Sequence, residues 1–377
     1  MNIILDQVFK RSAWLGFSGG EHNVRKFKGE KMKKLMVMVA ALAMISTSAY
    51  AADWNFYGSA RISTFYTSID TINSPAPSVD NYSQALQGNS RIGATVKVSD
   101  ELTGGFEYGT GVNVRKLYGE WNFGGGKLLV GQTYSPLNMF YSNQVFGSDN
   151  DMLAQGGIYS GREAMLQLTF GDFKVALVPT KQATDVVLGL TATSPESKIP
   201  GLEASYSMKM DNFSLKLAGG YQSYEADLGA VSYDVDSYVV ALGGKVDLGA
   251  FYVGGNFYVG QNPGNLIFLS TGGDNGWDDG LSAMTATGIV DNDAWGAMIA
   301  GGFVVNDMFT VEAGYGFVET EYDIVGSTKD KAQAYYVQSV ITLAPGVMVI
   351  PEVGVFDGDE NGDSETTYFG AKWQINF

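Results

Sequence analysis

The chain has 377 residues, no cysteine, 40 acidic against 24 basic side chains, 49 glycines and 13% aromatic residues. Its mean hydropathy is near zero, and without any apolar run of about 18 residues this excludes a bundle of membrane-spanning helices. The 45% hydrophobic residues exclude a disordered acidic chain. Glycine is roughly twice as common as the usual ~7%. Because each glycine inside a helix costs about 1 kcal/mol relative to alanine, this composition favours an all-β fold.

A secretory leader is expected at residues 32–51. Two lysines are followed by an apolar stretch from Leu35 to Ile45 and then by Ala49 and Ala51, which have the spacing of a cleavage site. The apolar stretch is shorter than the ~20 residues of a membrane span, so we expect the leader to be removed and the mature chain to begin at Ala52 or Asp53. Residues 1–31 precede the leader, and we interpret them as a misassigned start or as a disordered extension.

The exported part, residues 52–377, has 16 basic and 37 acidic residues and thus a net charge of −21. The one histidine of the chain, His22, lies before it. Without His or Cys, the exported part cannot use Ser-His or Cys-His nucleophilic chemistry, and it lacks the usual zinc ligands. We therefore expect neither an enzyme nor a cofactor. The acidic balance also argues against nucleic acid as a partner, because nothing would neutralise a phosphate backbone.

Segments of about ten residues with alternating apolar and polar side chains recur throughout the exported part, as in strands that have one face in lipid and the other in water. The first runs from Trp54 to Tyr66 and the last from Tyr368 to Phe377. Fourteen more are expected between them, at residues 90–98, 103–110, 114–123, 127–134, 162–170, 173–178, 201–210, 213–223, 237–246, 250–261, 293–305, 308–318, 333–343 and 347–356. The expected fold is all-β, a sixteen-stranded antiparallel transmembrane β-barrel over residues 52–377.

The connections between these strands alternate in length. Short turns such as Gly124-Gly125-Gly126, Asp211-Asn212 and Pro345-Gly346 interleave with mostly long polar loops, although the second outer loop, near Gly111, is short. Periplasmic turns at one end of a barrel and extracellular loops at the other have this pattern. The alternative is a soluble β-sandwich, but two packed sheets of this length need fewer apolar faces than the sequence provides.

Four short motifs carry a resemblance to a known family. They are FYGSARIS at residues 56–63, NSRIG at 89–93, GQTYSPLN at 131–138 and the C-terminal Phe377. In their order and spacing, the exported part resembles the general bacterial porin family, the trimeric sixteen-stranded diffusion channels of Gram-negative outer membranes.

The resemblance implies several properties of this chain. It implies a homotrimer in the outer membrane, in contact with lipid and lipopolysaccharide, and small outward residues such as Gly58 and Ala60 would permit close contact between barrels. It also implies a C-terminal signal for barrel assembly, formed here by Trp373, Ile375 and Phe377.

In that family the third long loop folds into the lumen, where its carboxylates face a basic ladder and form a constriction. The corresponding loop here is 135–161, with Asp149 and Asp151 in a similar acidic stretch. Ala154-Gln155-Gly156-Gly157 stands where the family often has Pro-Glu-Phe-Gly-Gly, so the second carboxylate comes from Asp149 or is absent. The resemblance implies that the ladder consists of Arg61, Arg91 and Lys116. The alternative is that these three residues only solvate the lumen wall.

Alternation also predicts which charged residues face the lumen. If Leu117 and Trp121 face lipid, then Lys116 faces the lumen and Arg115 falls on the outer face near the rim. The same argument places several lysines and glutamates in near balance on the lumen wall. The glutamates are Glu107, Glu120, Glu163, Glu203, Glu312 and Glu352.

The large negative excess therefore falls in loops, at residues 274–279 and 357–365. Acidic mouths concentrate cations, so we expect a modest cation preference that weakens with salt. A field between fixed cations and anions at the constriction would orient dipolar solutes, while the pore radius excludes large ones. The leading hypothesis is a general diffusion channel for small hydrophilic solutes and ions.

Two alternatives stay open at this point. One is a substrate-selective channel for sugars or anions, in which Tyr57, Tyr118, Tyr252 or Tyr258 would form a stacking path. The other is a non-conducting structural or adhesive barrel whose third loop plugs the lumen.

One acidic segment resembles the first half of a calcium-binding loop. Its oxygen ligands at alternating positions would be Asp357, Asp359, Asn361 and Asp363. The twelfth position, which should be a bidentate Glu, is Tyr368, so we expect no high-affinity metal site. The preferred interpretation is an acidic surface loop that weakly recruits divalent ions and bridges them to lipopolysaccharide phosphates.

Overall fold

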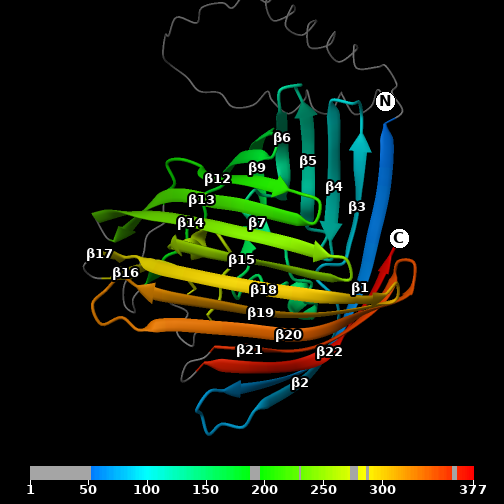
Figure 1. Cartoon of the computed structure of the whole chain (residues 1–377). Helices are drawn as coiled ribbons and strands as arrows, with labels where there is room; N and C mark the ends of the chain where they lie inside the picture. Colours follow the sequence, from blue (N-terminus) through cyan, green and yellow to red (C-terminus); the bar gives the residue numbers. More distant parts are fainter. Residues whose placement is uncertain (1–51, 187–195, 229–230, 272–278, 286–287, 359–362) are drawn as a thin grey trace, which may run out of the picture. The chain divides into compact units, whose positions relative to one another are not determined.

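The computed structural model describes residues 52–186, 196–228, 231–271, 279–285, 288–358 and 363–377 (Figure 1). The expected leader and the segment before it lie outside the described residues, as do Asp359 and Asn361 of the acidic loop. None of the helices in the described part is long and apolar enough to span a membrane.

Sixteen strands of the described chain form a closed antiparallel ring, in which each strand pairs with the next and the last pairs with the first. The expected sixteen-stranded barrel is confirmed. The strands are β1 (Asp53–Thr71), β3 (Arg91–Lys97), β4 (Leu102–Gly109), β5 (Val114–Asn122), β6 (Lys127–Tyr134), β9 (Arg162–Phe170), β10 (Phe173–Val178), β12 (Gly201–Lys209), β13 (Phe213–Leu228), β14 (Val231–Leu248), β15 (Phe251–Gln261), β18 (Asn292–Asn306), β19 (Phe309–Tyr322), β20 (Lys329–Ala344), β21 (Val347–Asp357) and β22 (Ser364–Asn376).

Several strands run further toward the outer loops than the apolar alternation indicated. β14, for example, begins at Val231 instead of residue 237. Its added residues Asp234 and Asp236 are exposed on the outer face, and Asp236 accepts a hydrogen bond from the Tyr221 hydroxyl at 2.8 Å. Charged outward residues end the alternation without ending the hydrogen-bonded ladder, because this part of the strand lies above the lipid-facing band.

The second strand of the barrel is interrupted, which the sequence did not indicate. β3 pairs with the first part of β1, from Asp53 to Ser59. β2 (Val79–Leu86) pairs with the later part of β1, from Ile62 to Ile69, and with no other described strand. Residues 87–90 form the break, where the Gln87 amide donates to the Arg61 carbonyl at 2.8 Å. The break turns the side chains of Gln87 and Asn89 toward loop residues in the lumen.

The ring closes at the C-terminus. Gly58 and Phe377 exchange two backbone hydrogen bonds of 2.6 and 3.0 Å, and the Phe377 ring lies over Gly58 so closely that a Cβ there would meet it at 2.5 Å. Gly58 therefore makes room for Phe377, and its outward face is not open to a neighbouring barrel as its small size had indicated. The outward alternation of the last strand is confirmed, since Trp373 and Ile375 are 50% and 53% exposed.

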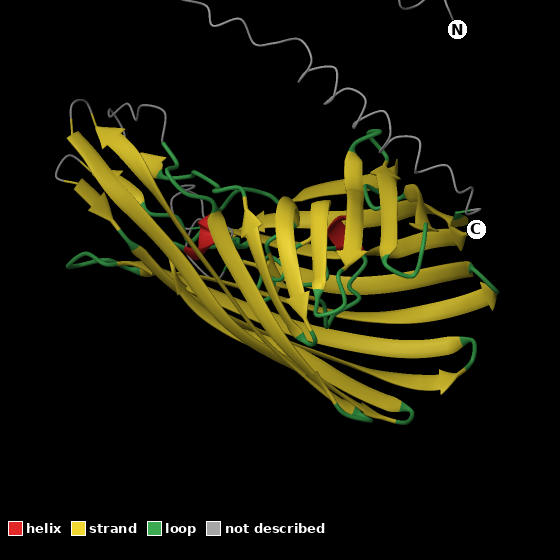
Figure 2. Ribbon diagram, turned by 90° about the horizontal axis from the view of Figure 1, so that it is seen from above, coloured by secondary structure: helices red, strands yellow, loops and turns green. Residues whose placement is uncertain are grey.

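Two outer loops fold inward. Loop 3 (residues 135–161) contains β7 (Asn138–Met139), α2 (Phe146–Asp149) and β8 (Ile158–Tyr159), and loop 6 (residues 262–291) contains η1 (Pro263–Asn265), β16 (Ala283–Thr285) and β17 (Gly288–Val290). β16 also pairs with β11 (Asp185–Val186) from another outer loop. Figure 2 shows the curved sheet from above, with the loops and both short helices inside it.

Loops 3 and 6 pack against each other and against the barrel wall through a hydrophobic cluster, here called the lumenal core. The Phe268 and Ser270 amides of loop 6 also donate to the Tyr159 and Ala154 carbonyls of loop 3, at 2.8 and 3.1 Å. The members of the lumenal core are Leu137, Met139, Ile158, Ala218, Val239, Ala241, Tyr258, Leu266, Ile267, Leu269, Ala294, Val318 and Ala332. One side of the lumen is thus filled with apolar side chains.

The closing seam can be tested by filling the space over Gly58. We expect Gly58→Val to push the Phe377 ring off the seam and to destabilise the barrel by about 1–3 kcal/mol, as overpacking does elsewhere. The measurement is the temperature at which the folded band converts to the unfolded band in SDS gel electrophoresis. Ala60→Val, two residues further along the same outward face, is the control. Equal melting temperatures of the two variants would contradict the packing of Phe377 over Gly58.

Candidate functional site

Loop 3 is held to the inner wall by carboxylates of the barrel strands. The first is Glu203 of β12, which is 1% exposed. Its two oxygens accept hydrogen bonds from the Leu137 amide at 3.0 Å and from the Ser160 hydroxyl at 2.6 Å, and so join both ends of loop 3 to one strand. A buried carboxylate is costly unless it is fully hydrogen-bonded, and here the loop backbone supplies the donors.

Two further glutamates hold the middle of loop 3 in the same way. Glu312 of β19 accepts from the Asn143 amide at 2.9 Å, and Glu352 of β21 accepts from the Val145 and Phe146 amides at 2.7 and 2.9 Å. The alternation of the sequence correctly placed these glutamates on the lumen face. Their charges are buried against loop 3, so they do not add to a charged surface of the lumen.

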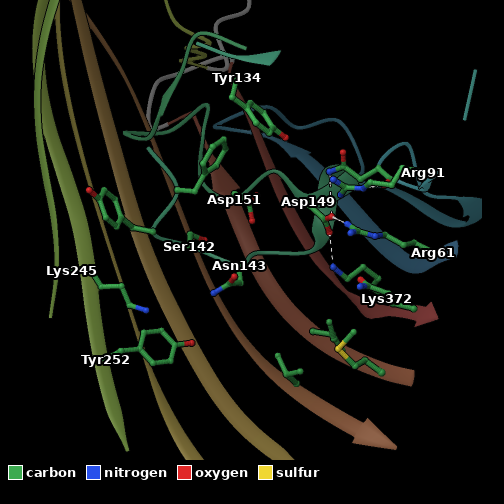
Figure 3. Close-up of a pocket in the computed structure, with 17 residues that line it drawn as sticks. Arg61, Arg91, Tyr134, Ser142, Asn143, Asp149, Asp151, Lys245, Tyr252 and Lys372 are labelled. Carbon is green, nitrogen blue, oxygen red and sulfur yellow. Dashed lines mark hydrogen bonds and ion pairs between the residues drawn. The ribbon is translucent and has the colours of Figure 1, made fainter. Parts of the chain in front are cut away.

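The tip of loop 3 is bound to the closing seam through Asp149. This carboxylate is paired with Arg61 of β1 and with Lys372 of β22, the latter at 2.8 Å. It also accepts hydrogen bonds from Gln87 and Asn89 at the break of the second strand, at 2.9 and 3.2 Å. Figure 3 shows Arg61 and Lys372 converging on Asp149, whose charge is therefore fully compensated.

A second cluster of charges surrounds Glu107 on β4, which is 1% exposed. It accepts hydrogen bonds from Arg115 at 2.7 Å and from the Tyr57 hydroxyl at 3.0 Å, and Arg91 and Lys116 lie 3.8 and 3.9 Å from it. Three basic side chains thus share one carboxylate. The short strands β3 and β5 therefore present a positive excess to the lumen.

The expectation that Arg115 lies on the outer face was wrong. Arg115 is 4% exposed and points inward like its neighbour Lys116. The register between β4 and β5 shifts here, because Glu107 pairs with Lys116 and Tyr108 pairs with Val114. Arg115 is the extra residue of this β-bulge, and a bulge breaks the two-residue periodicity on which the expectation rested.

Asp151 follows the tip of loop 3 and faces open space. Its carboxylate makes no hydrogen bond or ion pair to any other described side chain, and it lines the main lumenal cavity. Burial, followed by repulsion from Asp149, raises the pKa of Asp151 well above its ordinary value, although Lys372 acts in the opposite direction. Asp149, Asp151 and Met152 all have a positive φ of 53–62°, so the wall contacts hold the loop in a backbone conformation that non-glycine residues rarely adopt.

The main cavity lies between loop 3 and the inner wall of the barrel, where residues of β1, β3, β6, β14, β15 and β20–β22 line it, and it has a volume of about 600 Å³. Its lining includes four cations and two carboxylates among the described residues. They are Arg61, Arg91, Lys245, Lys372, Asp149 and Asp151 (Figure 3). A second cavity, of about 200 Å³, shares Asn89, Tyr134, Phe140, Asp149 and Asp151 with the first. The two form one passage along loop 3.

The predicted site residues are only partly brought together. Arg61 forms an ion pair with Asp149, whereas Arg91 and Lys116 both lie beside Glu107. Asp151 forms no ion pair with another described residue. Lys372 was missed as a partner of Asp149. The available signal was ring closure, which places Lys372 opposite Ser63, two residues from Arg61.

Of the tyrosines proposed as a stacking path, Tyr252 lines the main cavity. Tyr258 is 1% exposed inside the lumenal core, which corrects that expectation. The hydroxyls of Tyr57 and Tyr252 donate to Glu107 and Glu312, at 3.0 and 2.5 Å. The aromatic residues that line the two cavities of the passage are Tyr134, Phe140, Tyr141, Tyr159, Tyr252 and Phe268.

The acidic loop shows no metal-binding arrangement in the part that is described. Asp357 accepts a hydrogen bond from Gln333 at 3.0 Å, and Asp363 is 3% exposed. Across the described residues, no group of three or more His, Cys, Asp or Glu side chains could hold a metal ion.

A family model described as Gram-negative porin matches residues 39–361 of the chain. No protein in the curated set matches the sequence.

Several solved structures share the fold. The outer-membrane channel DcaP of Acinetobacter baumannii is 17% identical with a TM-score of 0.69, and the match covers 87% of this chain and 99% of that one. OmpF of Salmonella typhi is 14% identical with a TM-score of 0.55, covering 85% and 97%. OmpT of Vibrio cholerae in its trimer form is 15% identical with a TM-score of 0.53, covering 86% and 99%.

The glutamate anchors of loop 3 can be tested by hydrogen exchange. We expect Glu352→Gln to speed exchange of the Val145 and Phe146 amides about tenfold, because two charge-assisted hydrogen bonds are weakened by roughly 1.4 kcal/mol in total. The measurement is hydrogen–deuterium exchange of the detergent-solubilised protein. Glu120→Gln is the control, since Glu120 pairs with Lys127 at 2.9 Å and makes no hydrogen bond to loop 3. Unchanged protection in Glu352→Gln would contradict the anchoring role.

Proposed function

This chain belongs to the Gram-negative porin family, and from that membership we propose that loop 3 and the basic wall opposite it form the constriction of the channel. The protein is an outer-membrane channel for passive diffusion and not an enzyme. The observation that carries the proposal is the cavity of about 600 Å³ between loop 3 and the wall, lined by fixed charges of both signs.

The proposed roles follow from the positions of the charges. Arg61, Arg91 and Lys116 supply the positive side, while Asp151 supplies the one uncompensated carboxylate of loop 3. Asp149 is a positioning residue, since its charge is taken up by the seam. Fixed charges on opposite sides of a narrow passage orient dipolar solutes and admit those that fit.

We further propose a homotrimer in contact with outer-membrane lipid and lipopolysaccharide. The Vibrio cholerae protein of the same fold is described in a trimer form. The outer surface of the barrel is rich in exposed aromatic and aliphatic side chains, as a lipid-facing or barrel-facing surface requires.

Three expectations from the sequence stay predictions. They are the cleaved leader at 32–51, the assembly signal of Trp373, Ile375 and Phe377, and weak recruitment of divalent ions by the acidic loop. The outward exposure of the three C-terminal side chains, 50–71%, is compatible with recognition before the barrel closes.

We propose a modest cation preference that arises at the outer rim. Exposed carboxylates gather there on neighbouring strands, among them Asp234, Asp236 and Asp293. The constriction carries a positive excess that opposes this preference. Because exposed charges are screened by salt more strongly than partly buried ones, the rim should lose its influence first as salt rises.

Planar-bilayer recording tests both the channel and its selectivity. We expect open steps of constant size, and a reversal potential that reports potassium over chloride near 0.1 M salt and less so near 1 M, where the Debye length falls from about 10 to about 3 Å. Silent membranes would favour a non-conducting barrel, and anion preference at low salt would refute the acidic rim as its cause.

Acidification should act through Asp151. Its pKa is raised, so its charge is lost as the pH falls through a value above the ordinary range of aspartate, and the constriction then becomes more positive. We expect the potassium preference to fall at that pH in the native protein. Asp151→Asn should respond less to acid in this range, because its amide does not titrate. Asp100→Asn, in an exposed turn beside Lys97, is the control, and an unchanged pH response in Asp151→Asn would exclude this role.

A further inference from the structure

Two phenylalanine rings are exposed inside the lumen. Phe140 of loop 3 is 44% exposed and Phe268 of loop 6 is 53% exposed, and both line the cavities of the passage. The inward face of a water-filled barrel is ordinarily polar, and exposing a large apolar ring to water is unfavourable. The lumenal core shows that these loops can bury their apolar side chains, so the exposure of these two needs a cause.

The exposed rings belong to a continuous aromatic surface. The ring centroids of Tyr134 and Phe140 are 5.2 Å apart, those of Phe140 and Tyr159 6.1 Å, and those of Tyr134 and Tyr159 6.4 Å. Phe268 lines the same cavity of about 200 Å³ as these three rings and also lines a further cavity of about 310 Å³. We call these four residues the aromatic track.

Positive charge lies beside the track without matching negative charge. The Arg162 guanidinium lies 5.3 Å from the centre of the Tyr134 ring and donates to the Tyr134 hydroxyl at 3.0 Å, and the Lys116 ammonium lies 5.4 Å from the same ring. Arg162 forms no ion pair with a described carboxylate. Lys116 shares Glu107 with Arg91 and Arg115.

The carboxylates around the track do not cancel this excess. Asp149 is compensated by Arg61 and Lys372, and Glu163 is paired with Lys181 at 3.0 Å. Among the residues that the structure describes, Asp151 is the one opposing charge that lines the passage without a partner. The combination of flat apolar rings with uncompensated cations fits a solute that has a flat apolar face and a negative group.

We propose that the aromatic track is a binding site for small aromatic carboxylates, with the solute ring against Phe140 and Phe268 and its carboxylate at Arg162, since these three residues line the same cavity. The inference rests on the proposed channel function and adds a solute class to it. The space is sufficient, because a cavity of about 150 Å³ holds benzene and the smaller cavity on the track has about 200 Å³.

The test is single-channel recording with benzoate as the probe, in 1 M KCl so that the acidic rim is screened. We expect benzoate to interrupt the current at a concentration at least about tenfold lower than acetate, which lacks the ring, and benzyl alcohol, which lacks the charge. If benzoate blocks at the same concentration as acetate while the open steps are normal, the binding site at the aromatic track is refuted and the channel function is not. A membrane without open steps would instead overturn the channel function.

Variants separate the ring from the charge. Phe140→Leu and Arg162→Gln should each raise the half-blocking concentration of benzoate about tenfold, since each removes one of the two recognition elements. Lys174→Gln on β10 removes the same charge as Arg162→Gln at a residue that lines neither cavity of the passage, and Phe257→Leu removes an outward ring. Both controls should block like the native protein. Block that is unchanged in the two track variants would refute the proposal.

Discussion

In hydrocarbon, an unpaired backbone amide or carbonyl finds no water, so the strands of this protein must close into a ring. The critical point is the seam between β1 and β22, where the last residue of the chain bonds to Gly58 and covers it with its ring. The seam is also where Arg61 and Lys372 come together. The closure that satisfies the backbone therefore builds half of the site that holds Asp149.

Backbone groups also need hydrogen-bond partners inside the barrel, where loop 3 is buried against the wall. Its amide groups no longer have partners in a sheet, and carboxylates of β12, β19 and β21 replace those partners. A glutamate can accept from two donors at once, which suits the joining of an irregular backbone to a regular strand. The price is that these charges are withdrawn from the lumen. The remaining surface is therefore more basic than the count of wall residues indicated.

The local sequence pattern was sufficient to predict the strands, because side chains that face lipid alternate with side chains that face water along each strand. It failed where a contact depends on residues far apart or on a broken period. The bulge at Arg115 reverses a face within one residue, and the break at residues 87–90 is visible only in the pairing of two strands with β1. The lumenal core joins Leu137 to Leu266 across more than a hundred residues, and no alternation rule reports such a contact. The residues of the basic ladder could be named only through resemblance to a family. Their ion-pair partners could be identified only in the structure.

The lumenal core also decides where solutes travel. Because loops 3 and 6 fill part of the lumen next to β13, β14 and β18, the free passage runs along loop 3, past the cations of β1, β3 and β22. The resistance of a conduit rises as its cross-section falls, so the electrical drop across this barrel is concentrated beside loops 3 and 6, where they occupy part of the lumen.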